Sequence, residues 1–96
     1  MIRIGLDVHV STEIRQFMAK SKLFEVVVQA QDGESDQSWF DRGRASGMTV
    51  VYSGDFDLYE LCRGTDISFI RARPARALRK QLTLIHEGLK LGKNVW

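Results

Sequence analysis

The sequence predicts an α/β domain in which a mostly parallel four-stranded sheet lies between helices on both faces, a three-layer α/β/α sandwich. Short apolar runs rich in β-branched residues alternate with segments of helical periodicity, in the order β-α-β-α-β-α-β-α, and this alternation is typical of parallel sheets. The length of 96 residues suits a single domain spanning residues 1–96. Right-handed crossovers favour the strand order 2-1-3-4, with the first strand in the centre.

The first strand and the first helix are marked by composition and by capping. Residues 2–6 are short, apolar and β-branched, which predicts a strand. Ser11 is a suitable N-cap for a helix over residues 12–20, whose first turn carries an acid where the helix dipole favours one. Three residues of this helix recur at helical spacing and are expected to face the core: Ile14, Phe17 and Met18.

The middle of the chain continues the alternation. The apolar run of residues 23–28 predicts a strand that is buried on both faces. Ser35 can cap a helix over residues 36–46, and Gly47 is a suitable terminator for it. Two aromatic residues of this helix are expected to face inward: Trp39 and Phe40.

The last part of the chain supplies two strands and two helices. Residues 48–52 and 67–70 predict the third and fourth strands, and residues 56–63 predict a helix between them. Pro74 suits the first turn of a last helix that runs to about residue 91, because a proline there loses no intrahelical hydrogen bond. The expected core residues of these helices are Leu58, Leu61, Cys62, Leu78, Leu82, Ile85 and Leu89.

Composition excludes several classes of protein. The hydrophobic share of 44% and the charged share of 27% are those of a folded globular chain rather than a disordered one. No apolar run approaches the roughly 20 residues of a membrane-spanning helix, so no membrane association is expected. Asp7 comes too early for a secretory signal peptide. Cys62 is the single cysteine and can form neither an internal disulfide nor a zinc site, so we expect a soluble cytoplasmic protein.

Four aspartates are expected at one edge of the sheet: Asp7, Asp36, Asp55 and Asp57. The first follows strand 1, the second opens a helix, and the other two follow strand 3. Strands 1 and 3 are neighbours in the predicted order, and parallel sheets bind ligands at the carboxyl ends of such strands. Grouped carboxylates repel one another unless a cation neutralises them, and Mg²⁺ or Mn²⁺ suits such ligands. Each acid also has a structural alternative as a helix cap or a first-turn residue.

Charge is distributed unevenly along the chain. Residues 1–69 hold seven Lys/Arg and eleven Asp/Glu, a net charge of −4, whereas residues 70–96 hold seven Lys/Arg and one Glu, a net charge of +6. Basic residues at the end of the fourth strand and on one face of the last helix can hold phosphate groups; a solvated helix face is the alternative. This basic set comprises Arg71, Arg73, Arg76, Arg79 and Lys80.

An ordered set of four motifs runs along nearly the whole chain. The motifs are residues 4–10 (Ile-Gly-Leu-Asp-Val-His-Val), 33–39 (Gly-Glu-Ser-Asp-Gln-Ser-Trp), 50–58 (Val-Val-Tyr-Ser-Gly-Asp-Phe-Asp-Leu) and 67–82, which contains an Arg-x-Arg. This set resembles the PIN-domain nucleases, especially the short PIN-like proteins related to the VapC toxins of toxin–antitoxin systems. The third motif is also similar to the Ser-Gly-Asp-x-Asp of the related NYN nucleases.

The resemblance implies a metal-dependent ribonuclease that hydrolyses phosphodiester bonds, with the toxin of a toxin–antitoxin pair as one such role. It implies that the four aspartates bind one or two Mg²⁺ or Mn²⁺ ions and carry the catalysis, and that the basic set binds RNA. An antitoxin protein and a second copy of the chain are the candidate protein partners.

Two positions depart from the family pattern. Val8 stands where the first motif has a second acid, and Leu58 stands where the third motif closes with an aromatic residue. The missing acid leaves open a second hypothesis, a PIN-like module that has lost catalysis and acts through protein–protein interaction. A small-ligand receiver domain of the flavodoxin-like class is a third hypothesis, but no lysine stands near the end of a late strand, where such a domain needs one. His9, beside the acids, is a weaker candidate ligand.

Overall fold

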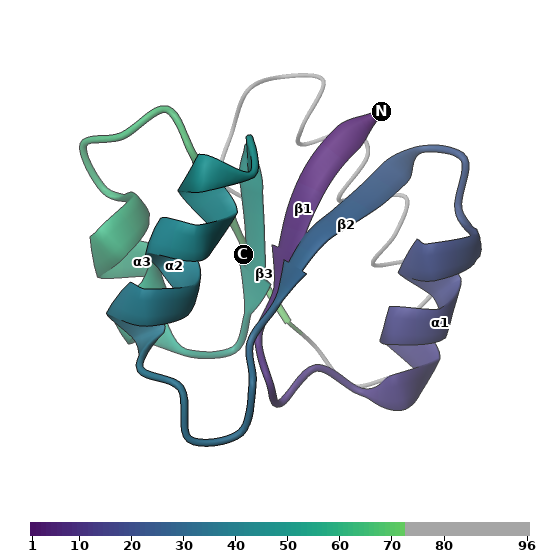
Figure 1. Cartoon of the computed structure of the whole chain (residues 1–96), viewed down its shortest axis with the longest axis horizontal. Coiled ribbons are helices and arrows are strands. Elements are labelled where there is room, and N and C mark those ends of the chain that lie inside the picture. The colour runs from purple at the N-terminus through teal and green to yellow at the C-terminus, as the bar shows by residue number, and fades with distance from the viewer. Residues whose placement is uncertain (73–96) are drawn as a thin grey trace.

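The computed structural model describes residues 1–72 of the chain. Strands and helices alternate along them: β1 (Ile2–Leu6), α1 (Thr12–Lys20), β2 (Phe24–Gln29), α2 (Asp36–Ala45), β3 (Val50–Ser53), α3 (Phe56–Cys62) and β4 (Ser68–Arg71). The four strands pair in parallel in the order β2-β1-β3-β4. Helix α1 covers one face of the sheet, and α2 and α3 cover the other (Figure 1). The predicted α/β class, the three layers and the strand order are confirmed; the predicted helix over residues 74–91 lies outside the described residues.

Helix starts follow the capping residues that the sequence offers. The Ser11 hydroxyl accepts a hydrogen bond from the Ile14 N–H at 3.3 Å, and the Ser35 hydroxyl accepts one from the Ser38 N–H at 3.2 Å. Each cap satisfies a backbone donor that the helix itself leaves unpaired. Helix α2 ends before Gly47, whose φ of +81° is one that glycine adopts without steric cost.

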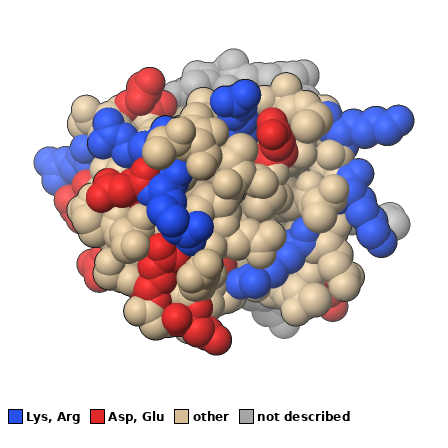
Figure 2. All heavy atoms as spheres, viewed as in Figure 1, with Lys and Arg blue, Asp and Glu red and all other residues tan. Residues whose placement is uncertain are grey.

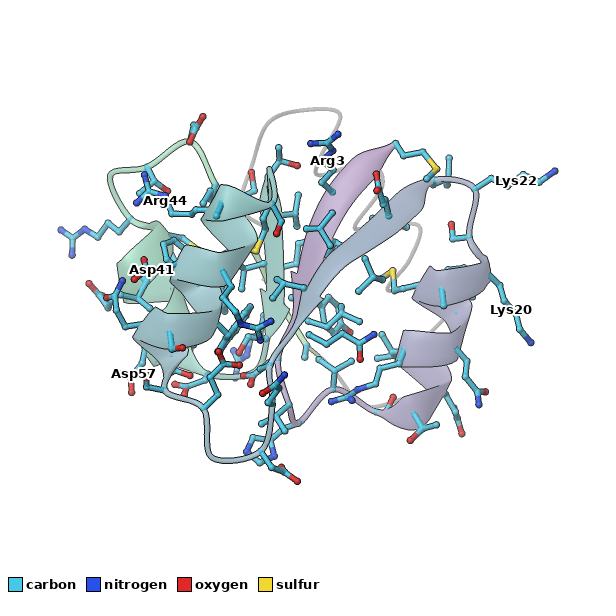
Figure 3. All side chains as sticks on the ribbon, viewed as in Figure 1. Arg3, Lys20, Lys22, Asp41, Arg44 and Asp57 are labelled. Carbon is cyan, nitrogen blue, oxygen red and sulfur yellow. The ribbon has the colours of Figure 1, made fainter. Side chains whose placement is uncertain are left out.

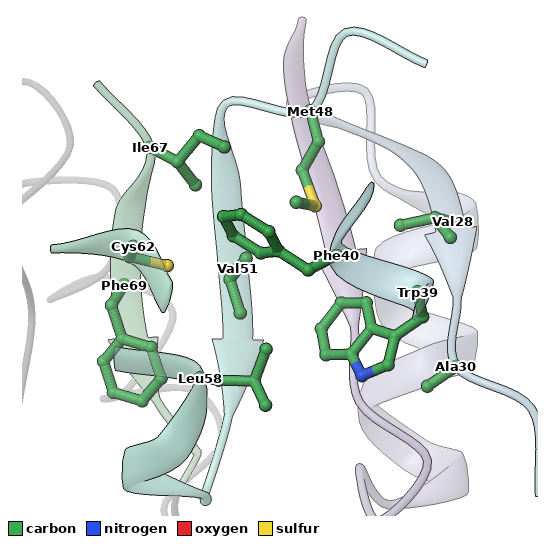
Figure 4. Packing of buried hydrophobic residues seen from close by; sticks show 10 residues of the cluster. All are labelled: Val28, Ala30, Trp39, Phe40, Met48, Val51, Leu58, Cys62, Ile67 and Phe69. Carbon is green, nitrogen blue, oxygen red and sulfur yellow. The ribbon is translucent and has the colours of Figure 1, made fainter. Parts of the chain in front are cut away.

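The sheet separates two hydrophobic clusters. Alternate residues of the central strands point to opposite faces, so Ile4 and Tyr52 pack on the side of α1 whereas Val51 packs on the side of α2 and α3. Figure 4 shows the second cluster, in which Trp39 and Phe40 of α2 lie over the sheet beside Leu58 of α3. Trp39 is fully buried and Phe40 nearly so, as the sequence predicted.

An irregularity in β2 lets consecutive residues of this strand pack against both clusters. Ile4 of β1 is paired with Val26, but the next residue, Gly5, is paired with Val28, so one residue of β2 is extra, as in a β-bulge. Val26 packs against the first cluster, whereas Val27 and Val28 belong to the second. The apolar run that predicted burial on both faces therefore divides between them at this point.

One expectation about the core is wrong. Phe17 was expected to face inward with Ile14 and Met18, but its side chain is 41% exposed, and these two residues alone are the buried residues of α1. Leu61 of α3 is partly buried and packs against the second cluster, on the side that was expected. A nine-residue helix buries a narrow stripe of its surface, so Phe17, beside that stripe, stays outside. No helix within residues 1–72 is long and apolar enough to span a membrane.

Candidate metal centre

The carboxyl ends of β1 and β3 lie side by side and bring two acidic segments together. Gly5 and Leu6 are paired with Val51 and Tyr52, and the pairing continues past the strand, where the Asp7 N–H donates to the Tyr52 carbonyl at 3.1 Å. Helices α2 and α3 both begin at this edge (Figure 1). Acidic atoms are prominent on the α2 and α3 side of the molecule toward this edge (Figure 2).

Three aspartates form what we call the aspartate group: Asp36, Asp55 and Asp57. One carboxylate oxygen of each lies within 4.8 Å of the others. Asp36 opens α2 and is half-buried, whereas the other two flank the start of α3 and are exposed; Figure 3 shows Asp57 at this end of the molecule, with Arg3 at the opposite end. The structure thus brings together three of the four predicted site residues.

Asp7, the fourth predicted residue, lies beside the aspartate group rather than within it. Its side chain is buried, and both of its oxygens accept hydrogen bonds: Oδ2 from the Ser53 hydroxyl at 2.5 Å and Oδ1 from the Val8 N–H at 2.6 Å. The Ser53 hydroxyl in turn accepts a hydrogen bond from the Asp55 N–H at 2.9 Å. Ser53 therefore ties the buried acid after β1 to the backbone of the group after β3.

Negative charges act on one another at this edge. Burial raises the pKa of Asp36, and repulsion from Asp55, Asp7 and Asp57 raises it further. The repulsion shows that Asp7 is within electrostatic reach of the group. A carboxylate that is hard to ionise because of its neighbours gains from a bound cation, which would remove the cause of the repulsion.

The buried Trp39 indole N–H faces this edge. Its interaction with Asp36 favours the ionised carboxylate and opposes the rise in the Asp36 pKa. The indole nitrogen is turned toward the carboxyl ends of the strands (Figure 4), yet no group within the described part of the chain meets the distance and angle of a full hydrogen bond with it. A buried donor without a full partner is uncommon, and here it is turned toward the acids.

Helix capping explains part of the acid arrangement. Asp55 is the N-cap of α3, and its Oδ1 accepts a hydrogen bond from the Asp57 N–H at 2.9 Å. The structural role that the sequence offered for Asp55 is thus present. The hydrogen bond occupies one of the two Asp55 carboxylate oxygens, which leaves the other oxygen to coordinate a cation.

The donor set fits a hard divalent cation. Carboxylate oxygens are ligands of Mg²⁺ and Mn²⁺, which bind through a few carboxylates and several waters. No cysteine or histidine belongs to the aspartate group, so nothing in it favours zinc or copper. His9 is exposed two residues after Asp7 and is not a member of the group.

Sequence reasoning missed two residues that position the acids. Ser53 is predicted from sequence only as part of the third motif, although its hydroxyl contacts both Asp7 and the Asp55 backbone. Arg15 of α1 donates from Nε to the Val10 carbonyl at 3.1 Å and from Nη2 to the carbonyls of Asp7 and Val8. It thereby holds the loop that follows β1. An arginine on a short amphipathic helix gives no sequence signal for such a role.

The other predicted contributors are placed as follows. Arg71 ends β4, is exposed, and pairs in register with Ser53, so it lies at the edge that carries the acids. Val8, which replaces the family acid, is half-buried and packs against the second hydrophobic cluster. The rest of the basic set lies outside the described residues: Arg73, Arg76, Arg79 and Lys80.

Comparisons of the chain with protein-family models, with curated proteins and with solved structures give no match. The resemblance to PIN-domain nucleases therefore remains a prediction that depends on the four motifs.

Proposed function

We propose that this protein is a metal-dependent ribonuclease of the PIN-like type, which binds Mg²⁺ or Mn²⁺ at the aspartate group and hydrolyses phosphodiester bonds. The observation that carries the proposal is the convergence of one carboxylate oxygen from each of three aspartates within 4.8 Å, at the edge of a parallel sheet where ligands bind. The raised pKa of Asp36 supports the same site, because a bound cation would offset the repulsion that contributes to it.

The residues of this edge have separable roles in the proposal. Asp36, Asp55 and Asp57 hold the cation, whereas Asp7 adds negative charge and is fixed by Ser53. A bound divalent cation would lower the pKa of a water and stabilise the charge that develops on phosphorus-bound oxygens. Arg71, at the same edge, is suited to pair with a substrate phosphate.

The test is cleavage of a mixed RNA in Mn²⁺ and in EDTA by the natural protein, by Asp36→Asn and by Asp41→Asn. Asp41 is an exposed acid on the same helix whose carboxylate accepts a hydrogen bond from Gln37, so it is a matched control. We expect cleavage that needs metal, is lost in Asp36→Asn and is retained in Asp41→Asn. Cleavage that persists in EDTA, or equally in Asp36→Asn, would contradict the metal-dependent mechanism.

One observation favours a second candidate, a PIN-like module that binds a partner protein without cleaving RNA. Val8 contributes an apolar side chain to the second cluster where the resembled family has an acid, so one metal ligand of the family is missing. Val8→Glu restores a carboxylate next to Asp7. Metal-dependent cleavage that appears only in Val8→Glu would favour the module, and an antitoxin-like protein would then be a candidate partner to seek by co-purification.

A further inference from the structure

An exposed aromatic ring lies at the edge of the sheet that carries Asp7 and the aspartate group, which we call the acidic edge. Four large hydrophobic side chains are exposed within residues 1–72, and among them Phe56, which is 50% exposed, stands directly between Asp55 and Asp57 at the start of α3. Half of this apolar ring faces solvent between two metal-binding candidates. The ring takes no part in capping α3, because Asp55 is the N-cap.

Two successive aromatic contacts connect the Phe56 ring to the core. Phe56 contacts Tyr59 edge to face with centroids 6.2 Å apart, and Tyr59 contacts the fully buried Phe69 in the same manner at 5.8 Å. Such aromatic pairs favour defined ring orientations. The exposed ring is thus connected to the core through two contacts. Because the Phe56 side chain is already restrained, binding of a ligand to the ring would cost little further side-chain entropy.

A cationic group lies over the same ring. The Arg71 guanidinium carbon is 5.5 Å from the Phe56 centroid, within the range of a cation–π interaction. Arg71 is paired in register with Ser53, the residue that contacts Asp7. A planar apolar surface, a guanidinium group and the aspartate group therefore meet at one edge.

We propose that Phe56 and Arg71 form a nucleotide subsite beside the metal centre, in which the ring stacks on a base of a single-stranded nucleic acid and the guanidinium pairs with an adjacent phosphate. Aromatic side chains stack on unpaired bases of any sequence, and arginine supplies the backbone contact. Bases inside a duplex do not present their faces, so the subsite selects single strands. The inference rests on the proposed function and names its substrate as an unpaired strand.

The test measures the affinity of labelled twelve-nucleotide oligomers for the natural protein and its variants. Each affinity is measured once in EDTA and once in Ca²⁺, which replaces Mg²⁺ or Mn²⁺. The oligomers are single-stranded RNA, single-stranded DNA, duplex RNA and an abasic strand. The variants are Phe56→Ala, Phe56→Leu, Phe56→Trp and the control Phe17→Ala, which removes an exposed ring from α1. We expect Phe56→Ala and Phe56→Leu to weaken single-strand binding about 5- to 150-fold, the range for loss of one stacked base.

The pattern across variants and oligomers decides the inference. Phe56→Trp should retain affinity, and Phe17→Ala should leave it unchanged; equal effects in RNA and DNA would show that the ribose 2′-hydroxyl is not read. The subsite is overturned if Phe56→Leu binds single strands as tightly as the natural protein does. It is also overturned if Phe56→Ala lowers the affinity for the abasic strand as much as for the intact strand, or if the natural protein binds no single strand in either condition. The EDTA arm does not involve metal, so failure of the metal centre would leave this result readable.

Discussion

At the scale of single residues, the Ser53 hydroxyl has the most demanding position at the acidic edge. It is fully buried, donates to the buried Asp7 carboxylate and accepts from the Asp55 backbone. A hydroxyl is one of the few side-chain groups that can donate and accept at once. Alanine would remove both hydrogen bonds and leave a buried carboxylate with fewer donors.

We therefore expect Ser53→Ala to lower the free energy of unfolding at pH 7 by about 1.5–3 kcal/mol, the range for hydrogen bonds to charged groups. Ser38→Ala is the matched control, because the Ser38 hydroxyl also donates to a carboxylate, that of Glu34, but at an exposed position. Urea unfolding of the two variants gives the comparison. Equal losses of unfolding free energy in both variants would show that the buried hydrogen bonds of Ser53 contribute no more than the exposed one of Ser38.

Glu34 provides a test of pH dependence at the same scale. Hydrogen bonds from Arg42, at 2.6 and 2.9 Å, are the main cause that lowers the Glu34 pKa from 4.5 to about 2. Because the folded pKa is below the unfolded one, the stabilisation is complete above about pH 4.5 and is lost as the pH falls toward 2. Glu34→Gln should be less stable than the natural protein at pH 7, and the difference should disappear near pH 2 in unfolding experiments across this range. A difference that stayed constant with pH would assign it to packing instead.

At the scale of elements, the packing of side chains over the centre of β1 depends on a missing side chain. A Cβ on Gly5 would lie 2.3 Å from Met48 Sδ, 2.9 Å from Val28 Cγ1 and 3.2 Å from the Trp39 ring. These distances are shorter than van der Waals contact, and Val28 and Trp39 are held by the second cluster. The glycine thus leaves room over β1 for Met48 before β3, for Val28 of β2 and, less tightly, for the Trp39 ring of α2.

Gly5→Ala should therefore destabilise the fold by about 1–3 kcal/mol, as overpacked cores do. Met48 is the nearest neighbour and has a flexible end, so Met48→Ala should relieve part of the strain. The double variant should lose less free energy of unfolding than the two single variants together. Strict additivity in urea unfolding would show that Gly5 is required for another reason.

The boundaries of the elements show what local sequence can determine. Helix α1 occupies the predicted residues 12–20, because its cap and periodicity are local signals. Strands β2 and β4 begin one residue later than predicted and include a polar or charged last residue, Gln29 or Arg71. A strand ends where its backbone ladder ends, and that depends on a neighbouring strand rather than on the hydrophobicity of its own residues.

At the scale of the whole molecule, the acidic edge predicts linkage between metal and stability. A cation that binds only the folded state stabilises it by about 2.7 kcal/mol at a hundredfold excess over Kd, which for this size is roughly 10–20 °C in Tm. We expect millimolar Mn²⁺ to raise Tm in thermal unfolding, and Asp36→Asn to abolish the response. Asp36→Asn without metal should itself be more stable than the natural protein at pH 7, because burial and repulsion from Asp55 and Asp7 disfavour the natural carboxylate.

Asp41→Asn is again the control and should respond to Mn²⁺ as the natural protein does. A natural protein whose Tm is insensitive to both Mg²⁺ and Mn²⁺ would contradict the metal centre and favour the binding module. A response that survives in Asp36→Asn would place the cation elsewhere.

The candidate site could be predicted only in part from sequence. Topology was sufficient to bring Asp36, Asp55 and Asp57 together, because strand order fixes which strand ends and helix starts are neighbours. The separate place of Asp7 could not be predicted, since it depends on where the Ser53 hydroxyl and the Val8 N–H point. Side-chain hydrogen bonds of this kind follow from three-dimensional geometry and leave no periodic pattern.

The unpaired residue of β2 gives this chain a place where its length can change. Between Ile4 and Gly5 the ladder passes from Val26 directly to Val28, so the register on either side is already that of a strand without Val27. Deletion of Val27 would give a regular ladder in which Phe24 and Val28 keep their faces of the sheet, whereas deletion of a residue within β1 or β3 would turn every later side chain of that strand over. We expect proteins that share this fold to differ by one residue here without any change in the acidic edge.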